Sequence, residues 1–572
     1  MTPQFDLEKN PFSRAGSYFS FSVITGKWAL LGPGLYLHTH HNGSVQLARL
    51  DPLKDQRSLK YEIETSQAKL SLRCKGEGKI TICIADPGTV RIQGQGVGLR
   101  METPPQRWCY TYALPDNVWA ISVNQAKWCF VLECLQGTMK MDAPWIQRKS
   151  FCKESERIVA TVKPDADGCF EVALDEFRTS WDRPRRRDFD RCVARVEAEY
   201  QAWEKNLPFA PQSLRKTRDL AAYTNWSAVV NPSGYLKRPT MLMSKMSMCN
   251  VFGWDHVFNA MAHVSHQPDL AWDQLMVMSD LQDAHGKSPD NMNDQSIMFT
   301  FGKPPVQGWG LRYMMRRNPR MFTPQRLNQV YRYLSRWTDW YLDQRRWDGK
   351  GLPYYTHGFD SGWDNSTIFD VGVPLVSPDL AAYLALQMDV LADLAAKINR
   401  PRERAKWREL SRGMIAELVA TLWRGDHFVG QVKPSDADVD CGSSITCMPI
   451  ILGRLLPREI QQQLVKNLGK FLTPWGIATE QPTSPEYKAL GYWRGPIWAP
   501  STLIVISGLM DIGEHKLAQD IGRRFCHMCK KSGFAENFNA LTGEGQFDPS
   551  YTWTSSVFMI LAGLEGKKKL FE

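Results

Sequence analysis

The sequence predicts a multidomain protein in which an antiparallel β-sandwich precedes a mainly α-helical domain closed into a ring. The length of 572 residues exceeds the size at which one hydrophobic core keeps growing, so at least two domains are expected. Apolar residues alternate with a period of two in the first third of the chain and follow a helical period after it. This change of period separates the two predicted domains.

The β pattern fills residues 1–182, which we assign to the sandwich. From Ile80 to Ile84, isoleucine alternates with threonine and cysteine, as in a strand with one buried face. Further apolar stretches cover 118–123, 128–135 and 170–174. Glycines and prolines separate them, and many short strands between turn residues are typical of an antiparallel sandwich.

Helical spacing begins after Asp188. One apolar stripe predicts a linker helix within residues 183–208 that ends before Pro208. The residues of this stripe are Phe189, Val193, Val196, Tyr200 and Trp203. The remaining chain, 209–572, is the predicted helical domain.

Two helix starts in this domain are marked by a capping residue followed by proline, at Thr323-Pro324 and Ser377-Pro378. The second opens an apolar stripe from Leu380 to Ile398. Further helices are predicted at 213–229, 254–267, 270–284, 325–345, 403–423, 456–471, 500–511, 514–531 and 551–563. Helices in antiparallel pairs predict a closed toroid or a solenoid, and the lack of a fixed-period repeat favours the toroid.

Composition excludes several classes of protein. Hydrophobic residues at 43% and charged residues at 23% are globular values, which argues against wholesale disorder. No run of 18 apolar residues and no cationic-then-apolar leader occurs, so we expect a cytoplasmic protein without a membrane partner. Thirteen irregularly spaced cysteines indicate reduced thiols and not a secreted disulfide framework.

Three local patterns could bind a metal or an anion, and each has a simpler interpretation. Cys526-His527-Met528-Cys529 lacks the second pair of ligands that a zinc site needs. The HTHH stretch, with His38, His40 and His41, fits exposed polar residues better than metal ligands. The arginine cluster at 183–191 and the net charge of +10 could suit an anionic partner. No nucleic-acid motif accompanies them, so the cluster fits a solvated linker better. We therefore predict no metal, no cofactor and no nucleic-acid partner.

The segments between the predicted helices carry carboxylates and tryptophans. GFDSGWDNS, residues 358–366, places Asp360 and Asp364 around Gly362 and Trp363. An aromatic face covers the C–H face of a pyranose, while carboxylates take up hydroxyls or move protons. Asp, Gly, Asn and Ser are also the commonest turn residues, so this stretch alone fits a plain turn equally well.

Four other segments share this composition: 253–256 (GWDH), 303–309 (KPPVQGW), 491–498 (GYWRGPIW) and 535–539 (AENFN). Alternate loops of a helical toroid emerge on one rim. Five such loops on one rim would line a single pocket.

In this order, the segments resemble the inverting glycoside hydrolases of the trehalase and processing-glucosidase clan, particularly glycoside hydrolase family 63. The matching motifs are WDHVFNA (254–260), KPPVQGWG (303–310), SGWDNS (361–366), GYWRGPIW (491–498) and ENFNALTG (536–543), with YTWT (551–554) closing the set. They cover about residues 210 to 565. The resemblance implies an (α/α)6 barrel, for which an N-terminal β domain is common.

The resemblance also implies roles for individual residues: Asp364 is the general acid and Glu536 the general base. The residues that it places in sugar-contacting loops are Trp254, Asp255, Gln307, Trp309, Asp360, Trp363, Trp493, Arg494, Trp498 and Trp553. Position 360 departs from the pattern, because many relatives carry glutamate there, which leaves open what Asp360 touches. Arg494 fits a structural ion pair as well as a sugar contact.

The chemistry of inversion sets what the two carboxyls must do. A protonated carboxyl faces the glycosidic oxygen, and an ionised carboxylate roughly 6.5–9.5 Å away activates water. We expect burial beside Trp363 and repulsion from Asp360 to raise the pKa of Asp364. We expect the amides of Asn537 and Asn539 to keep Glu536 ionised.

The predicted activity is that of an exo-acting α-glycosidase that releases glucose or mannose with inversion from a short α-linked saccharide or glycoside. Two alternatives stay open. A sugar isomerase or epimerase on a similar barrel would use His256, His285 or His357 as proton shuttles. A non-catalytic sugar-binding protein would keep the tryptophans but has no need for the carboxylate pair.

Overall fold

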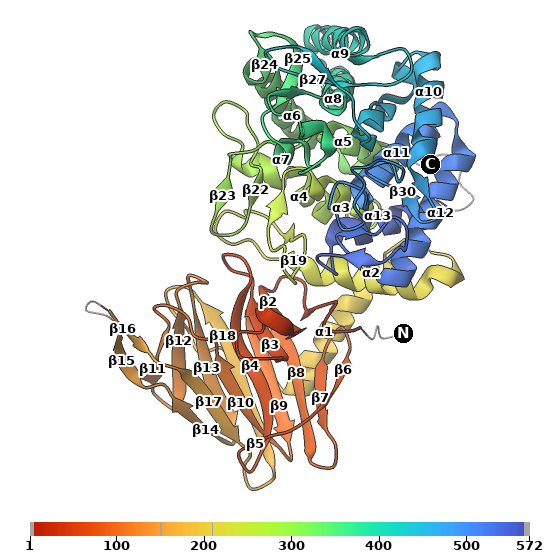
Figure 1. Ribbon diagram of the computed structural model, residues 1–572. Helices are drawn as coiled ribbons and strands as arrows, with labels where there is room; N and C mark the ends of the chain where they lie inside the picture. The colour runs from red at the N-terminus through yellow and green to blue at the C-terminus, as the bar shows by residue number, and fades with distance from the viewer. Residues whose placement is uncertain (1–4, 149–151, 209, 565–572) are drawn as a thin grey trace.

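The computed structural model describes residues 5–148, 152–208 and 210–564. A β domain and a larger helical domain stand end to end, and the helix α1 (Phe189–Lys205) leads from one to the other (Figure 1). The predicted order of a β-sandwich followed by an (α/α)6 barrel is confirmed.

The β domain has a small two-stranded sheet, β15 (Trp145–Arg148) and β16 (Cys152–Ser155), and two large, facing antiparallel sheets. The first has the order β1 (Phe12–Ser13), β2 (Phe19–Ile24), β3 (Gly34–Thr39), β4 (Val45–Lys54), β10 (Gly98–Thr103), β17 (Ile158–Lys163) and β14 (Thr138–Asp142), with β5 (Arg57–Ser58) beside β4. The second has the order β11 (Tyr110–Leu114), β12 (Val118–Val123), β13 (Trp128–Gln136), β18 (Cys169–Phe177), β9 (Thr89–Gln95), β8 (Gly78–Asp86), β7 (Leu70–Cys74) and β6 (Glu62–Thr65). Their inner faces share one apolar core.

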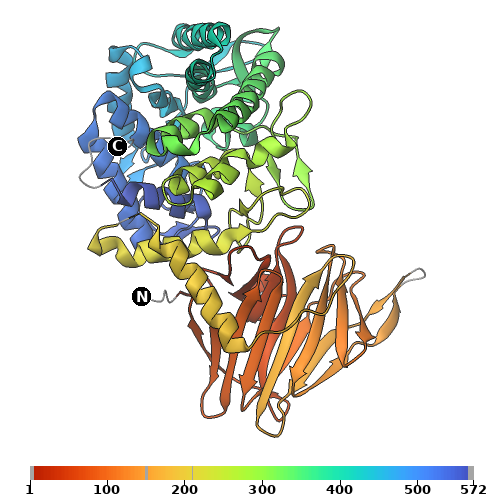
Figure 2. The ribbon, with the colours of Figure 1, turned by 180° about the vertical axis from the view of Figure 1, so that it is seen from behind.

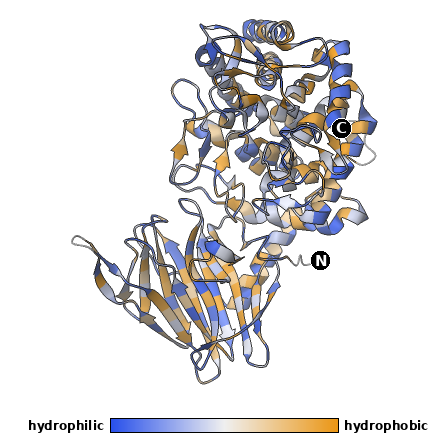
Figure 3. Cartoon of the chain, viewed as in Figure 1, coloured by the Kyte–Doolittle hydropathy of each residue, from blue (hydrophilic) through white to orange (hydrophobic). Residues whose placement is uncertain are grey.

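Strand β8 shows how the sequence pattern produces this sandwich. Ile80, Ile82 and Ile84 point into the core between the sheets, and hydrophobic and hydrophilic positions alternate along the strands of this domain (Figure 3). Cys83, on the opposite face, is also buried, because α1 covers the outside of β8. The apolar stripe of α1 supplies this cover, and Figure 2 shows the helix lying along the sheet.

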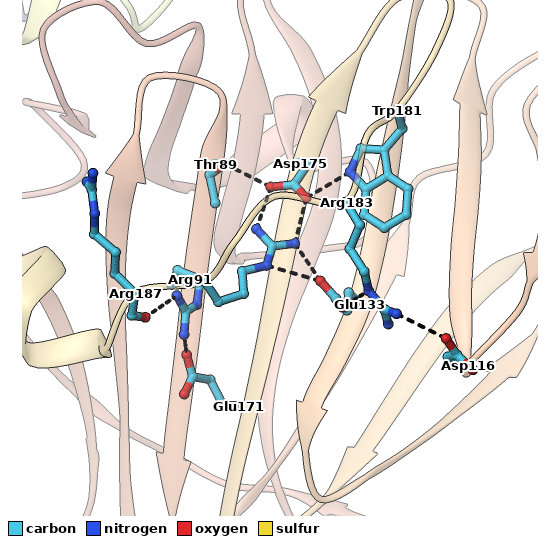
Figure 4. A network of polar contacts seen from close by, with 10 residues as sticks. Thr89, Arg91, Asp116, Glu133, Glu171, Asp175, Trp181, Arg183 and Arg187 are labelled. Atoms are coloured by element: carbon cyan, nitrogen blue, oxygen red, sulfur yellow. Dashed lines mark hydrogen bonds and ion pairs between the residues drawn. The ribbon is translucent and has the colours of Figure 1, made fainter.

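The arginine cluster between β18 and α1 is exposed, as predicted, except at Arg186, which is half-buried. Arg186 forms ion pairs with Glu133 and Asp175, each at 2.6 Å, and both carboxylates are buried. Arg183 contacts the same Glu133 at 2.7 Å and Asp116 at 3.0 Å (Figure 4). Arg183 and Arg186 therefore hold the segment against the outer face of the second sheet.

The helical domain is a double ring. Its inner elements are α3 (Asp255–His263), α5 (Gln307–Arg317), α8 (Pro378–Lys397), η6 (Ser444–Leu455), α11 (Ala499–Ile512) and α13 (Thr552–Ala562). Each packs against the next, and α13 packs against α3, which closes the ring. The outer elements are α2 (Arg215–Ala228), α4 (Pro268–Met276), α6 (Pro324–Gln344), α9 (Pro401–Leu422), α10 (Arg458–Leu468) and α12 (His515–Ser532).

Inner and outer helices differ in their apolar pattern. The outer helix α12 keeps a polar face, whereas α8 is buried on nearly all sides, not only along the predicted stripe. The predicted start of α6 is confirmed, because the hydroxyl of Thr323 accepts a hydrogen bond from the backbone N–H of Arg326 at 3.2 Å, before Pro324.

Every inner element begins at the same end of the barrel. The segments predicted to carry chemistry precede or open α3, α5, α8, α11 and α13, so they meet there. Within the described residues, no helix is long and apolar enough to cross a membrane, and no group of three or more metal-ligating side chains occurs.

Replacing Arg186 by methionine is expected to lower the free energy of unfolding by about 3 kcal/mol, because two buried carboxylates lose their main counter-charge. Urea denaturation followed by tryptophan fluorescence measures the change. Arg185→Met is the matched control, since that side chain is exposed. Equal stability of the two variants would contradict the assigned role of the Arg186 network.

Candidate active site

Hydrogen bonds join the first four of the five segments directly at this end of the barrel. The Gln307 side chain donates to the carbonyl of Gly253 at 2.6 Å, and the Lys303 ammonium donates to the carbonyl of Phe359 at 2.6 Å. Asn365 links the third segment to the fourth, since its amide donates to the carbonyl of Gly491 at 3.0 Å.

The segment 358–366 folds into a one-turn helix, α7 (Gly358–Ser361), that ends in a left-handed Gly362 with φ +70°. A Cβ at Gly362 would lie 2.6 Å from the ring of Trp254, and one at Gly358 would lie 2.0 Å from the carbonyl oxygen of Asp364. The turn therefore closes tightly over Trp254 because both positions lack a side chain. This closure holds the backbone of Asp364 in place.

Asp360 accepts hydrogen bonds from residues that flank this turn, Gly302 and Thr356. Its Oδ1 accepts from the N–H of Gly302 at 2.6 Å, and its Oδ2 accepts from the N–H and the hydroxyl of Thr356, each at 2.6 Å. We infer that it supports the turn and does not bind a sugar hydroxyl. The sequence left open what Asp360 touches, and these three donors supply the answer.

Asp364 is half-buried, and burial raises the pKa of its carboxyl. The ammonium of Lys303 opposes this rise, while the carboxylate of Asp290 adds to it. The expected burial is present, but the like charge that raises the pKa comes from Asp290 and not from Asp360. Lys303 also contacts Asp290 at 3.1 Å, so one ammonium serves both carboxylates.

Glu536 is buried on the fifth segment and accepts a hydrogen bond from the Tyr492 hydroxyl at 2.7 Å. Burial raises its pKa to about 7, the Tyr492 bond lowers it, and the nearby Asp548 raises it. The charge of Asp364 also raises the pKa of Glu536, which places the two carboxyls in one electrostatic environment.

The predicted cause of an ionised Glu536 is wrong. The side-chain oxygen of Asn539 accepts from the N–H groups of Leu541 and Thr542, so this amide closes its own turn. The side chain of Asn537 is buried without a hydrogen-bond partner within the described residues. The donor that stabilises the charged form of Glu536 is the hydroxyl of Tyr492.

Five tryptophans form a continuous floor beneath these carboxyls. Trp493 stacks on Trp498 with ring centroids 4.0 Å apart and lies 4.7 Å from Trp363. Trp553 meets Trp254 and Trp498 edge-on, at 5.7 and 5.6 Å. All five are buried. The indole N–H groups of Trp363 and Trp553 are buried and have no hydrogen-bond partner within the described residues.

Three other residues predicted to contact the sugar, Asp255, Trp309 and Gln307, are hydrogen-bonded within the protein. Asp255 accepts from the Tyr551 hydroxyl at 3.2 Å, and burial raises its pKa to about 8. Trp309 donates to the hydroxyl of Ser507 at 3.0 Å, within the barrel core. Gln307 is likewise buried, with its amide on Gly253.

Arg494 has structural partners. Its guanidinium donates to the carbonyl of Asn365 at 2.8 Å and forms ion pairs with Asp370 and, at 3.4 Å, with Glu486. The alternative of a structural ion pair therefore describes Arg494 in this structure.

Sequence reasoning missed Lys303 and Tyr492. Both lie inside quoted motifs, but their roles depend on tertiary partners, Asp290 and Phe359 for Lys303 and Glu536 for Tyr492. Tyr492 also has a φ of +62°, which bulky residues rarely adopt and which no sequence pattern announces.

The profile of the Mannosylglycerate hydrolase MGH1-like glycoside hydrolase domain matches residues 248–554. The chain belongs to this family. The match spans α3 to the first turn of α13 and contains all five segments. The resemblance to inverting glycoside hydrolases drawn from the motifs is thereby confirmed.

Individual relatives of this MGH1-like chain are distant. Mannosylglycerate hydrolase MGH1 of Selaginella moellendorffii is 30% identical over 146 residues, which are 25% of this chain and 28% of the relative. The chain thus matches little more than a quarter of that protein. A GH63 mannosylglycerate hydrolase from Thermus thermophilus, solved with glucose, has a TM-score of 0.53 and 19% identity over 60% of this chain and 99% of its own.

A bacterial glucoamylase solved with acarbose has a TM-score of 0.65 and 11% identity over 100% of this chain and 95% of its own. This likeness shows the fold alone. It extends over both domains of the MGH1-like chain, whereas the Thermus structure covers only part of it.

Replacing Tyr492 by phenylalanine is expected to raise the pKa of Glu536 above its value of about 7, because the carboxylate loses the donor that favours its charged form. Infrared difference titration, with Glu536→Gln as the blank, measures this pKa. Tyr487→Phe is the control, since that hydroxyl has no hydrogen-bond partner within the described chain. An unchanged titration in Tyr492→Phe would show that the hydroxyl does not tune Glu536.

Proposed function

We propose that this protein is an inverting, exo-acting glycoside hydrolase that releases mannose or glucose from a short α-glycoside with a small anionic aglycone such as glycerate. One observation carries the proposal. Two carboxyls with raised pKa, Asp364 and Glu536, lie on different segments of one rim above a floor of tryptophans.

The chemistry follows from these two groups. Asp364, when protonated, gives its proton to the glycosidic oxygen, while ionised Glu536 removes a proton from the attacking water. Tyr492 favours the ionised form of Glu536, and the buried floor restricts water around Asp364. Because water attacks from the face opposite the departing aglycone, the released sugar has the inverted configuration.

The charges around Asp364 and Glu536 predict how activity depends on pH. Burial and Asp548 raise the pKa of Glu536 to about 7, while Lys303 opposes the rise at Asp364. The productive form has Glu536 ionised and Asp364 protonated. Activity should rise as pH increases through the pKa of Glu536 and fall when Asp364 loses its proton.

Support for the substrate class comes from the relatives and from Lys303. The Selaginella and Thermus proteins named above are mannosylglycerate hydrolases, and one Thermus structure was solved with Tris and D-glycerate. Lys303 is a buried cation whose charge acts on both Asp364 and Asp255. Its two polar partners among the described residues leave one of three N–H donors for an anionic or hydroxylated substrate.

The alternative of an isomerase has less support. His256 is buried, its Nδ1 lies 2.9 Å from the carbonyl oxygen of Phe252, and burial lowers its pKa to about 4. His357 and His285 lie in exposed turns. A non-catalytic sugar-binding role would leave the raised pKa values of Asp364 and Glu536 without a use.

Asp364→Asn and Glu536→Gln are each expected to reduce hydrolysis of mannosylglycerate or glucosylglycerate by about 10² to 10⁴-fold, because each removes one proton-transfer group. The roles separate on an α-glycosyl fluoride, whose leaving group needs no proton. Asp364→Asn should recover much of its rate there, and Glu536→Gln should not. Initial rates of sugar and fluoride release measure both effects.

Asp520→Asn, on the outer helix α12, is the control for charge removal away from the site. Recovery in Glu536→Gln in place of Asp364→Asn would reverse the two roles. Wild-type rates in both variants would overturn the proposed function.

A further inference from the structure

His41 lies at the boundary of the two domains and is held on every side. Its ring stacks between Tyr18 at 3.8 Å and Trp128 at 3.9 Å, nearly parallel to both. Its Nδ1 lies 2.7 Å from Asp294 Oδ2 in the helical domain, and its Nε2 lies 3.3 Å from Glu176 Oε2 in the β domain. The prediction that the histidines of HTHH are exposed is therefore wrong, since all three are buried.

Asp294 belongs to a hairpin that leads directly to the candidate site. It occupies the turn between β22 (Asn291–Met292) and β23 (Ile297–Met298), and its Oδ1 accepts from the N–H of Asn42 at 2.9 Å. Asp290 precedes the hairpin and contacts Lys303 at 3.1 Å. Lys303 in turn acts on Asp364.

The same hairpin also supports the first segment of the site. Strand β22 pairs with β21 (Val251–Phe252), which is followed by Trp254 and Asp255. The N–H of Gly253 donates to the carbonyl of Asp290 at 2.7 Å. A shift of the hairpin would therefore move both Lys303 and the start of α3 at Asp255.

A second connection reaches the Glu536 side. The Lys245 ammonium is buried and donates to the hydroxyl of Ser13 at 3.0 Å and the carbonyl of Ser17 at 2.6 Å, both in the β domain. Two residues on, the N–H and hydroxyl of Ser247 donate to Asp548 Oδ2 at 3.0 and 2.6 Å. The carbonyl of Asp548 accepts from the N–H of Glu536 at 2.7 Å.

We propose that the β domain takes part in the function of the active site by positioning two of its residue pairs. His41 positions the Lys303–Asp290 ion pair beside Asp364, and Lys245 positions Asp548, which is bonded to Glu536. This inference rests on the proposed function. Both residues are positioning residues, because neither touches the reacting atoms and each acts through a segment that does. The β domain is then required for turnover and not only for stability.

Charge contributes to the His41 connection. Burial disfavours the charged imidazole, but the hydrogen bond with Asp294 and the contact with Glu176 outweigh it and raise the pKa of His41. The other titratable groups near it are Tyr18, whose pKa is raised by burial, Lys245, whose pKa burial lowers to about 7, and His40, which burial keeps neutral. The charged bond is complete at low pH and is lost as pH rises through the raised pKa of His41.

His41→Gln tests the inference by the pH dependence of kcat/KM. If the hairpin loosens, Lys303 moves away from Asp364, the pKa of Asp364 rises, and the alkaline limb moves to higher pH. We expect kcat to fall by about 10- to 100-fold, the effect of misplacing a catalytic group by about 1 Å. Asp294→Asn, which changes the other partner of the same bond, should move the same limb if His41→Gln does not fold.

Glu176→Gln is the matched control, since it removes the second carboxylate beside His41 but keeps the bond to Asp294. It should move the alkaline limb less than His41→Gln and Asp294→Asn do, even if the melting temperature falls. A wild-type limb and kcat in both His41→Gln and Asp294→Asn, with a lower melting temperature, would overturn the inference and leave the proposed function standing.

Hydrogen exchange separates failure of this inference from failure of the proposed function. If the wild-type protein cleaves no tested glycoside, the proposed function fails. Faster amide exchange over 290–303 in His41→Gln than in Glu176→Gln would still support the positioning role. Equal exchange in the two variants would overturn it.

Discussion

The burial of several carboxylates at one end of the barrel is the constraint on which the rest of the structure depends. An unpaired charge in such a place costs several kcal/mol, so each carboxyl either takes a proton or finds a donor. The Lys303 ammonium forms an ion pair with Asp290 and opposes the rise of the pKa of Asp364. The hydroxyls of Tyr492 and Tyr551 donate hydrogen bonds to Glu536 and Asp255. These donors do not fully compensate for burial, so the pKa values of Asp364, Glu536 and Asp255 stay raised. Acid–base chemistry near neutral pH needs carboxyls with raised pKa values.

The fold places these groups by a simple rule. Inner helices all begin at one rim, so the segments that precede them meet there although they are far apart in the sequence. Tight turns then fix the side chains, as at Gly362 over Trp254. The β domain adds a second layer of support, because its loops bond to segments beside Asp364 and Glu536, the two carboxyls of the candidate site.

Local patterns in the sequence predicted the architecture well, because periodicity and caps are short-range properties. Thr323 before Pro324 marks the start of α6, and the stripe of α1 packs on β8 as its spacing requires. The gathering of Asp364 and Glu536 at one rim also followed from the order of the motifs. By contrast, the partners of Asp360 and Arg494 are set by turns and loops that only the folded chain brings together. The same holds for Arg186 and His41, whose carboxylate partners lie in distant parts of the sequence.

The assignment of Asp364 and Glu536 as an inverting pair fixes the configuration of the first product. Proton NMR of the anomeric region during cleavage of an α-mannoside or α-glucoside of glycerate by the wild-type protein reads that configuration. We expect the β-anomer of the free sugar to form first and the α-anomer to follow only through mutarotation. First formation of the α-anomer would show retention and would contradict the assigned roles of both carboxyls.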